Sequence, residues 1–128
     1  MPSIKTVLLL DDSATVRSLV RVHLMGRSLD FVEAADGGRA LKLVHLMPIA
    51  LIIADVQMPI VDGISFMKQL RSDPDPQVNS VPVILLTALR DKGMRSTALA
   101  VGANAFVNKP VASEELLAAV DRLLPNMG

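Results

Sequence analysis

The sequence contains no cysteine, tryptophan or tyrosine, and three phenylalanines are the only aromatic side chains among its 128 residues. The lack of cysteine excludes a disulfide framework, thiolate catalysis and a cysteine zinc site. Thirteen basic and thirteen acidic residues cancel at neutral pH, which argues against a nucleic-acid-binding or anionic-membrane surface. No apolar run is as long as a membrane span, and the first residues lack a signal-peptide pattern. We therefore expect a cytoplasmic protein that binds neither nucleic acid nor membrane.

Short apolar runs alternate with helical patterns along the chain. Hydrophobic residues make up 51% of it, and a chain of this size buries roughly two thirds of its unfolded surface, so we expect one aliphatic core and one domain spanning residues 1–128. The predicted strands are residues 6–10, 31–34, 51–54, 81–87 and 105–108. The predicted helices are residues 14–25 after Ser13 as N-cap with Gly26 as the stop, 38–45, 64–71, 92–100, and 114–124 after Ser113 as N-cap.

This order is a strand and a helix repeated five times. Such alternation favours right-handed crossovers and a doubly wound parallel sheet, so the predicted class is α/β with five strands and five helices. The continuous apolar character of three strands indicates that helices cover both faces of the sheet. The polar, proline-containing stretch at residues 72–81 is predicted to be a surface loop.

Polar side chains stand where the predicted strands end. Asp11 and Asp12 follow the first strand, Asp55 the third, Thr87 ends the fourth, and Lys109 follows the fifth. Sites in open parallel sheets form outside the carboxyl ends of the strands, so these side chains should converge. Two carboxylates about 4 Å apart repel by about 4 kcal/mol at an effective dielectric near 20, which calls for a cation. Oxygen-only ligands favour Mg²⁺, Mn²⁺ or Ca²⁺ over zinc.

Each of these residues taken alone has a simpler interpretation. An aspartate beside a helix favours its N-terminus, a strand-end threonine bonds the local backbone, and a lone lysine is usually solvated. The convergence of five such residues favours a site. His23 and His45 lie in helical patterns without a partner motif, which favours surface or half-buried packing over a phosphodonor or ligand role. Gly37-Gly38 matches no nucleotide-binding motif.

Five stretches carry a family resemblance: LLLDDSATVR (8–17), EAADGGRAL (33–41), LIIADVQMPIVDG (51–63), VPVILLTA (81–88) and FVNKPV (106–111). In order and spacing they resemble the response-regulator receiver domain of two-component signalling, over about residues 5–124. The resemblance implies a flavodoxin-like sheet with strand order 2-1-3-4-5, and a single receiver domain similar to the chemotaxis regulators.

The resemblance also implies roles for the converging side chains. Asp55 would attack a phosphoryl group and become an acyl phosphate. Asp12, Asp55 and the backbone carbonyl of Gln57 would hold Mg²⁺, or Mn²⁺ in its place, and Asp11 would reach the ion directly or through water. Lys109 would pair with the phosphoryl oxygens, and Thr87 would donate a hydrogen bond to one of them. These roles match phosphoryl transfer, which needs an in-line nucleophile and positive charge on the equatorial oxygens.

Three further expectations rest on the resemblance. The peptide bond between Lys109 and Pro110 should be cis, an isomer that costs about 0.5–1 kcal/mol at proline. Gln57 and Leu89 should flank the path of the hydrolytic water and so tune dephosphorylation, with Leu89 shielding the acyl phosphate. Phe106 should move inward when Thr87 is drawn to the phosphate, as a packing switch; the alternative is a core phenylalanine that never moves.

The expected function is a phosphorylation-dependent signalling switch rather than an enzyme, beyond self-catalysed phosphotransfer and slow autodephosphorylation. Its expected partners are a histidine kinase or phosphotransfer protein and an unknown protein target, contacted through about residues 91–124. We expect a monomer or a weak phosphorylation-dependent dimer, whether the domain is free-standing or part of a longer chain. An aspartyl-phosphate hydrolase is disfavoured because Gln57 occupies the place of its second aspartate and a cap domain has no room. A degenerate binding module is disfavoured because every acidic residue is present.

Overall fold

Five parallel strands form a single sheet in the computed structural model, which describes residues 4–57, 62–87 and 92–124. The strands are β1 (Lys5–Leu10), β2 (Leu29–Ala34), β3 (Leu51–Asp55), β4 (Val83–Thr87) and β5 (Ala105–Asn108). Their order across the sheet is β2-β1-β3-β4-β5, and each neighbouring pair is parallel. The predicted doubly wound α/β class and strand order are therefore confirmed.

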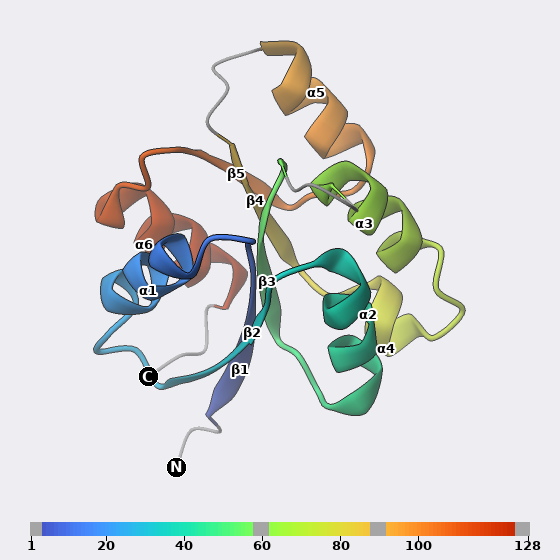
Figure 1. The fold of residues 1–128 in the computed structure, drawn as a ribbon, viewed down its shortest axis with the longest axis horizontal. Coiled ribbons are helices and arrows are strands. Elements are labelled where there is room, and N and C mark those ends of the chain that lie inside the picture. The colour runs from blue at the N-terminus through green and yellow to red at the C-terminus, as the bar shows by residue number, and fades with distance from the viewer. Residues whose placement is uncertain (1–3, 58–61, 88–91, 125–128) are drawn as a thin grey trace.

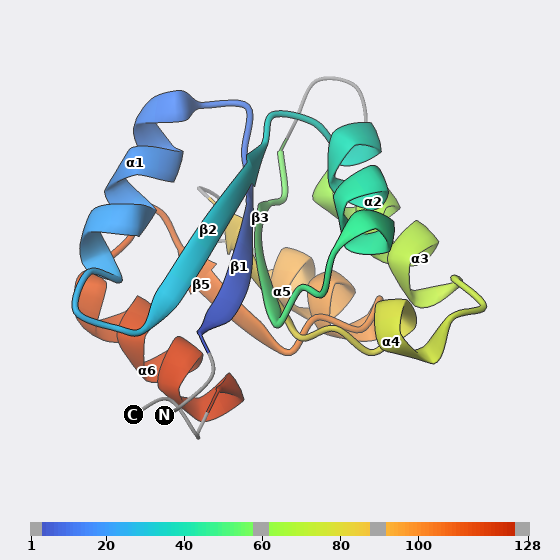
Figure 2. The same ribbon diagram turned by 90° about the horizontal axis from the view of Figure 1, so that it is seen from below.

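Helices cover both faces of this sheet. They are α1 (Ala14–His23), α2 (Gly37–Leu46), α3 (Gly63–Arg71), α4 (Pro76–Asn79), α5 (Lys92–Ala100) and α6 (Ser113–Leu123). Figures 1 and 2 show α1 and α6 on one face, and α2, α3 and α4 on the other. None of the helices in the described part of the chain is long and apolar enough to span a membrane.

The central strands have no solvent-facing side. In β1, Leu8 and Leu10 pack against the α2 and α3 side, whereas Val7 and Leu9 pack against the α1 and α6 side. All five residues of β3 and of β4 are buried. Burial on both faces explains why these strands are continuously apolar in sequence instead of alternating.

Three local predictions need correction. The stretch at 72–81 contains the one-turn helix α4, so six helices are present among the described residues instead of five. Asp75 accepts a hydrogen bond from the Gln77 backbone as its N-cap, and Pro76 is the first helical residue, a favourable start because proline lacks an N–H there. Ser113 is not the N-cap of α6: the cap is Ala112, without a side-chain hydrogen bond. Helix α1 ends at His23, and Gly26 takes its positive φ of 94° in the following turn.

Candidate functional site

Three carboxylates meet at the carboxyl edge of the sheet, where β1 and β3 end. Asp11, Asp12 and Asp55 each offer an oxygen, and these oxygens all lie within 4.8 Å of one another. Asp11 and Asp55 are only 3% and 4% exposed, whereas Asp12 is exposed. The cluster thus has two buried members and one that opens to solvent.

The turn between β1 and α1 fixes the orientation of Asp11. Its backbone N–H donates to the Ala34 carbonyl at 3.1 Å, which extends the β1–β2 ladder by one residue. Its Oδ1 accepts a hydrogen bond of 2.8 Å from the Ser13 N–H, and Ser13 in turn caps α1 through Val16. The Oδ2 atom of Asp11 is thereby left to face Lys109.

Lys109 connects the carboxylates across the sheet. Its Nζ lies 3.2 Å from Asp55 Oδ2 and 3.4 Å from Asp11 Oδ2. Its backbone N–H donates to the Thr87 carbonyl at 2.6 Å, so the ends of β4 and β5 stay together. The bond from Lys109 to Pro110 is cis, the isomer that the sequence predicts. The ammonium therefore reaches two acidic strand ends from a third strand.

A glycine lets α3 approach the backbone of Asp55. The Gly63 N–H donates to the Val56 carbonyl at 2.8 Å, and a Cβ at Gly63 would lie 2.5 Å from the Asp55 carbonyl oxygen. Any larger residue would force α3 away from β3. Asp55 Oδ1 accepts a hydrogen bond of 3.2 Å from the Gln57 N–H, while the Gln57 side chain is exposed.

The electrostatics of the site favour an added cation. Burial raises the pKa of Asp11, and the nearby Asp55 charge raises it further, while the Ser13 hydrogen bond and Lys109 lower it. Asp11 and Asp55 thus share the Lys109 ammonium, Asp12 adds a third carboxylate, and burial penalises the charged form of Asp11. The donor set is entirely oxygen, which fits a hard divalent cation such as Mg²⁺. The carboxylate cluster could hold such an ion.

Thr87 and Phe106 lie on the same face of the sheet. Thr87 is fully buried at the end of β4, and Phe106 is half-buried on β5. In the register of the sheet, Leu85 pairs with Phe106 and Thr87 with Asn108, so Phe106 is a diagonal neighbour of Thr87. The predicted tuning residue Leu89 falls outside the described residues.

Sequence reasoning missed two side chains of α1 that contact the backbone of the site. Arg17 donates hydrogen bonds to the Asp11 carbonyl and to Glu33 Oε1. The His23 ring lies with Nε2 3.1 Å from the Val111 carbonyl, two residues after Lys109. Nothing in the sequence pairs residues 23 and 111. Arg17 looks in sequence like any solvent-exposed arginine of a helix.

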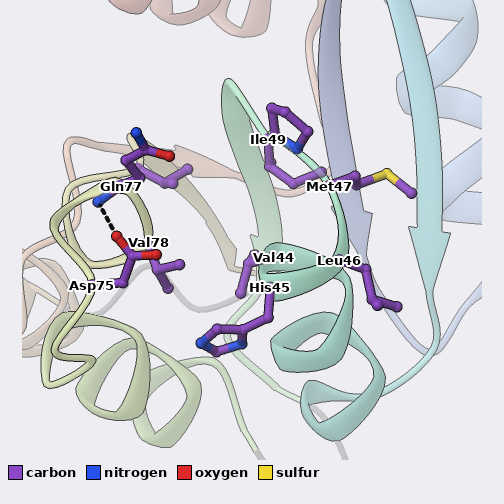
Figure 3. Close-up of a pocket in the computed structure, with 10 residues that line it drawn as sticks. Val44, His45, Leu46, Met47, Ile49, Asp75, Gln77 and Val78 are labelled. Atoms are coloured by element: carbon purple, nitrogen blue, oxygen red, sulfur yellow. Dashed lines mark hydrogen bonds between the residues drawn. The ribbon is translucent and has the colours of Figure 1, made fainter.

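A second concave region lies at the opposite, amino edge of the sheet. Its volume is about 350 Å³, and Figure 3 shows it between the end of α2 and the α4 turn, with His45 and Asp75 at its rim. Asp75 is engaged there as the N-cap of α4. The hollow lacks the clustered carboxylates of the carboxyl edge.

Comparison with known proteins agrees with this fold. A family model described as the response regulator receiver domain matches residues 7–121. The chemotaxis protein CheY4 of Vibrio cholerae superposes with a TM-score of 0.84 at 32% identity, covering 94% of this chain and 99% of that one.

Two relatives place similar sequences inside longer proteins. The "Probable transcriptional regulator ycf27" of Cyanophora paradoxa is 37% identical over 120 residues, which cover 94% of this chain and 48% of that protein. The "Hybrid signal transduction histidine kinase D" of Dictyostelium discoideum is 34% identical over 118 residues, 92% of this chain and 7% of that protein. The chain thus spans about half the length of the ycf27 relative.

Proposed function

Because the chain belongs to the response regulator receiver domain family of two-component signalling, we propose that it is a switch phosphorylated on Asp55. The phosphoryl donor is a histidine kinase or a phosphotransfer protein. The domain acts in the cytoplasm as a monomer or a weak phosphorylation-dependent dimer, passes its signal to a protein target by direct contact, and is a signalling domain instead of a turnover enzyme.

The position of Asp55 is the observation that carries this proposal. It ends the central strand β3, is 4% exposed, and has Oδ2 3.2 Å from Lys109 Nζ. An oxygen of this carboxylate forms the new bond to phosphorus, and the bond from phosphorus to the donor nitrogen breaks, its electron pair returning to the donor imidazole. Lys109 neutralises charge on the equatorial oxygens, and the Thr87 hydroxyl donates to one of them.

The chain's oxygen atoms support a bound Mg²⁺, with Mn²⁺ as an alternative. Asp12, Asp55 and the backbone carbonyl of Gln57 would hold it, with Asp11 ligating directly or through water. When bound, the ion supplies positive charge to the phosphoryl oxygens and relieves the repulsion among the carboxylates. We propose that Gln57 and Leu89 flank the path of the hydrolytic water and that Leu89 shields the acyl phosphate, so Leu89→Glu should shorten the lifetime of the acyl phosphate.

The output of the switch is proposed to pass through Thr87 and Phe106. A groove of about 330 Å³ lies between α5, β5 and α6, and Phe106, Leu99 and Arg122 are among the residues that line it. When Thr87 bonds the phosphoryl group, the neighbouring Phe106 ring moves inward and changes this groove, within the expected target surface of about residues 91–124.

NMR of the phenylalanine rings tests this switch. The chain has only three phenylalanines, so the ring of Phe106 is readily assigned. Beryllofluoride with Mg²⁺ should shift its resonances, and Thr87→Ala should abolish that shift. Ring resonances that are identical with and without the phosphoryl mimic would identify Phe106 as a static core residue.

The substitution Asp55→Asn tests the phosphoacceptor directly. It removes the nucleophile but keeps the size of the side chain, so labelling by acetyl phosphate in Mg²⁺ should be abolished. Mass spectrometry of the intact protein measures the phosphoryl adduct, and the exposed Asp30→Asn is the matched control that should label normally. Undiminished labelling of Asp55→Asn would refute the proposal, and steady consumption of acetyl phosphate by enzyme-like turnover would favour the hydrolase alternative.

A further inference from the structure

We propose that α1 is the positioning helix of the acidic site, in which Arg17 fixes the backbone of Asp11 and His23 fixes the backbone that follows Lys109. This inference rests on the proposed function, since it concerns the same site. It adds two positioning residues that contact neither the phosphoryl group nor the ion and act through the main chain.

The contact of His23 connects α1 to the segment that carries Lys109. A backbone carbonyl only accepts hydrogen bonds, so the Nε2 atom 3.1 Å from the Val111 oxygen must carry a proton and donate. The Val111 side chain is buried in the core shared by α1 and α6. The segment after Lys109 is thus held by its carbonyl as well as by its side chain.

Lys109 depends on this segment for its position. Its backbone N–H is bonded to the Thr87 carbonyl on the N-terminal side, and the His23 contact secures the chain two residues later. The Lys109 ammonium lies 3.2 and 3.4 Å from its two carboxylate partners, within ion-pairing distance of both. A displacement of about 1 Å in such a site costs as much as a hundredfold in rate.

Arg17 secures the other wall of the site. Its side chain is 16% exposed and donates to Glu33 Oε1 at 2.9 Å as well as to the Asp11 carbonyl. The Asp11 carboxylate and carbonyl belong to one residue, so fixing the carbonyl limits rotation of the turn that presents the carboxylate. Mutation of a group that orients a metal ligand without touching the metal typically lowers metal affinity about 10- to 100-fold.

The chain supplies matched controls for both contacts. Arg21 lies one turn after Arg17 and also bonds Glu33, at 3.2 Å, but its guanidinium lies over the Phe31 ring, 5.2 Å from the ring centroid. His45 is the other histidine, and its Nδ1 likewise lies 2.8 Å from a backbone carbonyl, that of Leu41, at the far edge of the sheet. The test variants are therefore Arg17→Met and His23→Phe, and the controls are Arg21→Met and His45→Phe.

The two contacts should separate in their effects. We expect Arg17→Met to weaken Mg²⁺ binding about tenfold by calorimetry. We expect His23→Phe to slow phosphorylation by acetyl phosphate at saturating Mg²⁺ about tenfold, with Mg²⁺ affinity nearly unchanged. His23→Gln, whose amide can donate to the same carbonyl, should recover most of the rate. In metal-free protein the ¹³C carbonyl resonance should move at Val111 for His23→Phe and at Asp11 for Arg17→Met.

The inference would be overturned if Arg17→Met and His23→Phe left both the phosphorylation rate and the Mg²⁺ affinity unchanged. It would also be overturned if test and control variants lost rate and affinity equally, in proportion to the fall in their melting temperatures. The proposed function fails separately. If the unsubstituted protein takes no phosphoryl group, that proposal is wrong, while the Mg²⁺ affinities and carbonyl resonances still decide whether α1 positions the cluster.

Discussion

Lys109 and Arg71 lie at opposite edges of the same sheet, and their surroundings differ in charge. Lys109 faces two carboxylates at 3.2 and 3.4 Å. Arg71 donates hydrogen bonds of 2.7 to 3.2 Å to neutral oxygens of four residues. These acceptors are the carbonyls of Asn79, Val81 and Gly102 and the side chain of Asn104.

The difference separates a structural contact from a binding site. The Arg71 guanidinium has a complete set of partners, and burial lowers its pKa without removing its charge. Gly102 permits this contact, because its φ is 97° and a Cβ would lie 2.9 Å from Arg71 Nε. At the carboxyl edge, by contrast, the Lys109 ammonium pairs with two carboxylates, and Asp12 adds a third to the cluster, so among the described residues the cluster keeps an excess of negative charge for an incoming cation.

Replacing Lys109 should give the largest effect, on rate. Lys109→Met keeps an unbranched side chain but removes the charge that faces the transferred phosphoryl group. We expect phosphorylation by acetyl phosphate in saturating Mg²⁺ to slow by about 100-fold or more, by analogy with the loss of one preorganised donor. A rate equal to that of the unsubstituted protein, measured by intact mass against time, would remove Lys109 from the mechanism.

Replacing Arg71 should instead lower stability. Arg71→Met leaves several carbonyls of the α3–β4 and α5–β5 connections without a donor, and we expect the free energy of unfolding to fall by about 3 kcal/mol. Urea titration followed by far-UV circular dichroism measures this, since the chain has no tryptophan. The exposed Lys68→Met on the same helix is the control. Folded Arg71→Met should still be phosphorylated at the normal rate. If Arg71→Met instead kept full stability and was phosphorylated slowly, Arg71 would belong to the site and would not be a structural residue.

The carboxyl edge was largely predictable from sequence. Continuous apolar runs located β1, β3 and β4, and the rule that parallel strands end at one edge brought Asp11, Asp55 and Lys109 together. Their chemical types are informative because carboxylates rarely end buried strands without a reason. The functional roles of these residues, including Gln57, Leu89 and the Thr87–Phe106 pair, stay predictions.

The amino edge and the contacts of α1 were not predictable. Helix α4 has four residues, too few to show a helical period, so only Asp75 and Pro76 marked it. The contacts of Arg71 and His23 join residues 31 and 88 positions apart in sequence. They depend on the rotation of each helix about its own axis against the sheet. The hydrophobic pattern does not fix that rotation closely enough to predict a single side-chain contact. Charged helix residues look alike in sequence whether they are solvated or bonded to a carbonyl.

The smallest effect we predict is a pH dependence at the amino edge, where His45 lies beside the hollow of Figure 3. Its Nδ1 is 2.8 Å from the Leu41 carbonyl and its Nε2 is 2.6 Å from Asp73 Oδ2. Both partners accept hydrogen bonds, so both nitrogens donate only in the charged imidazolium. The Leu41 hydrogen bond and then Asp73 raise the pKa of His45.

The direction of this pH dependence follows from the linkage between proton binding and folding. A group whose pKa is raised on folding stabilises the protein fully below its unfolded pKa, about 6.5 for histidine, and loses that contribution as the pH rises through the folded value. Stability should therefore decline slightly above pH ~6.5, and the decline should be absent in His45→Gln and reduced in Asp73→Asn, which keeps the Leu41 hydrogen bond. The effect is small because the pair is exposed to solvent and salt. Melting temperatures across this pH range, compared between each variant and the unsubstituted protein, isolate the contribution of this pair. If the full decline survives in His45→Gln, it does not arise from the His45–Asp73 pair.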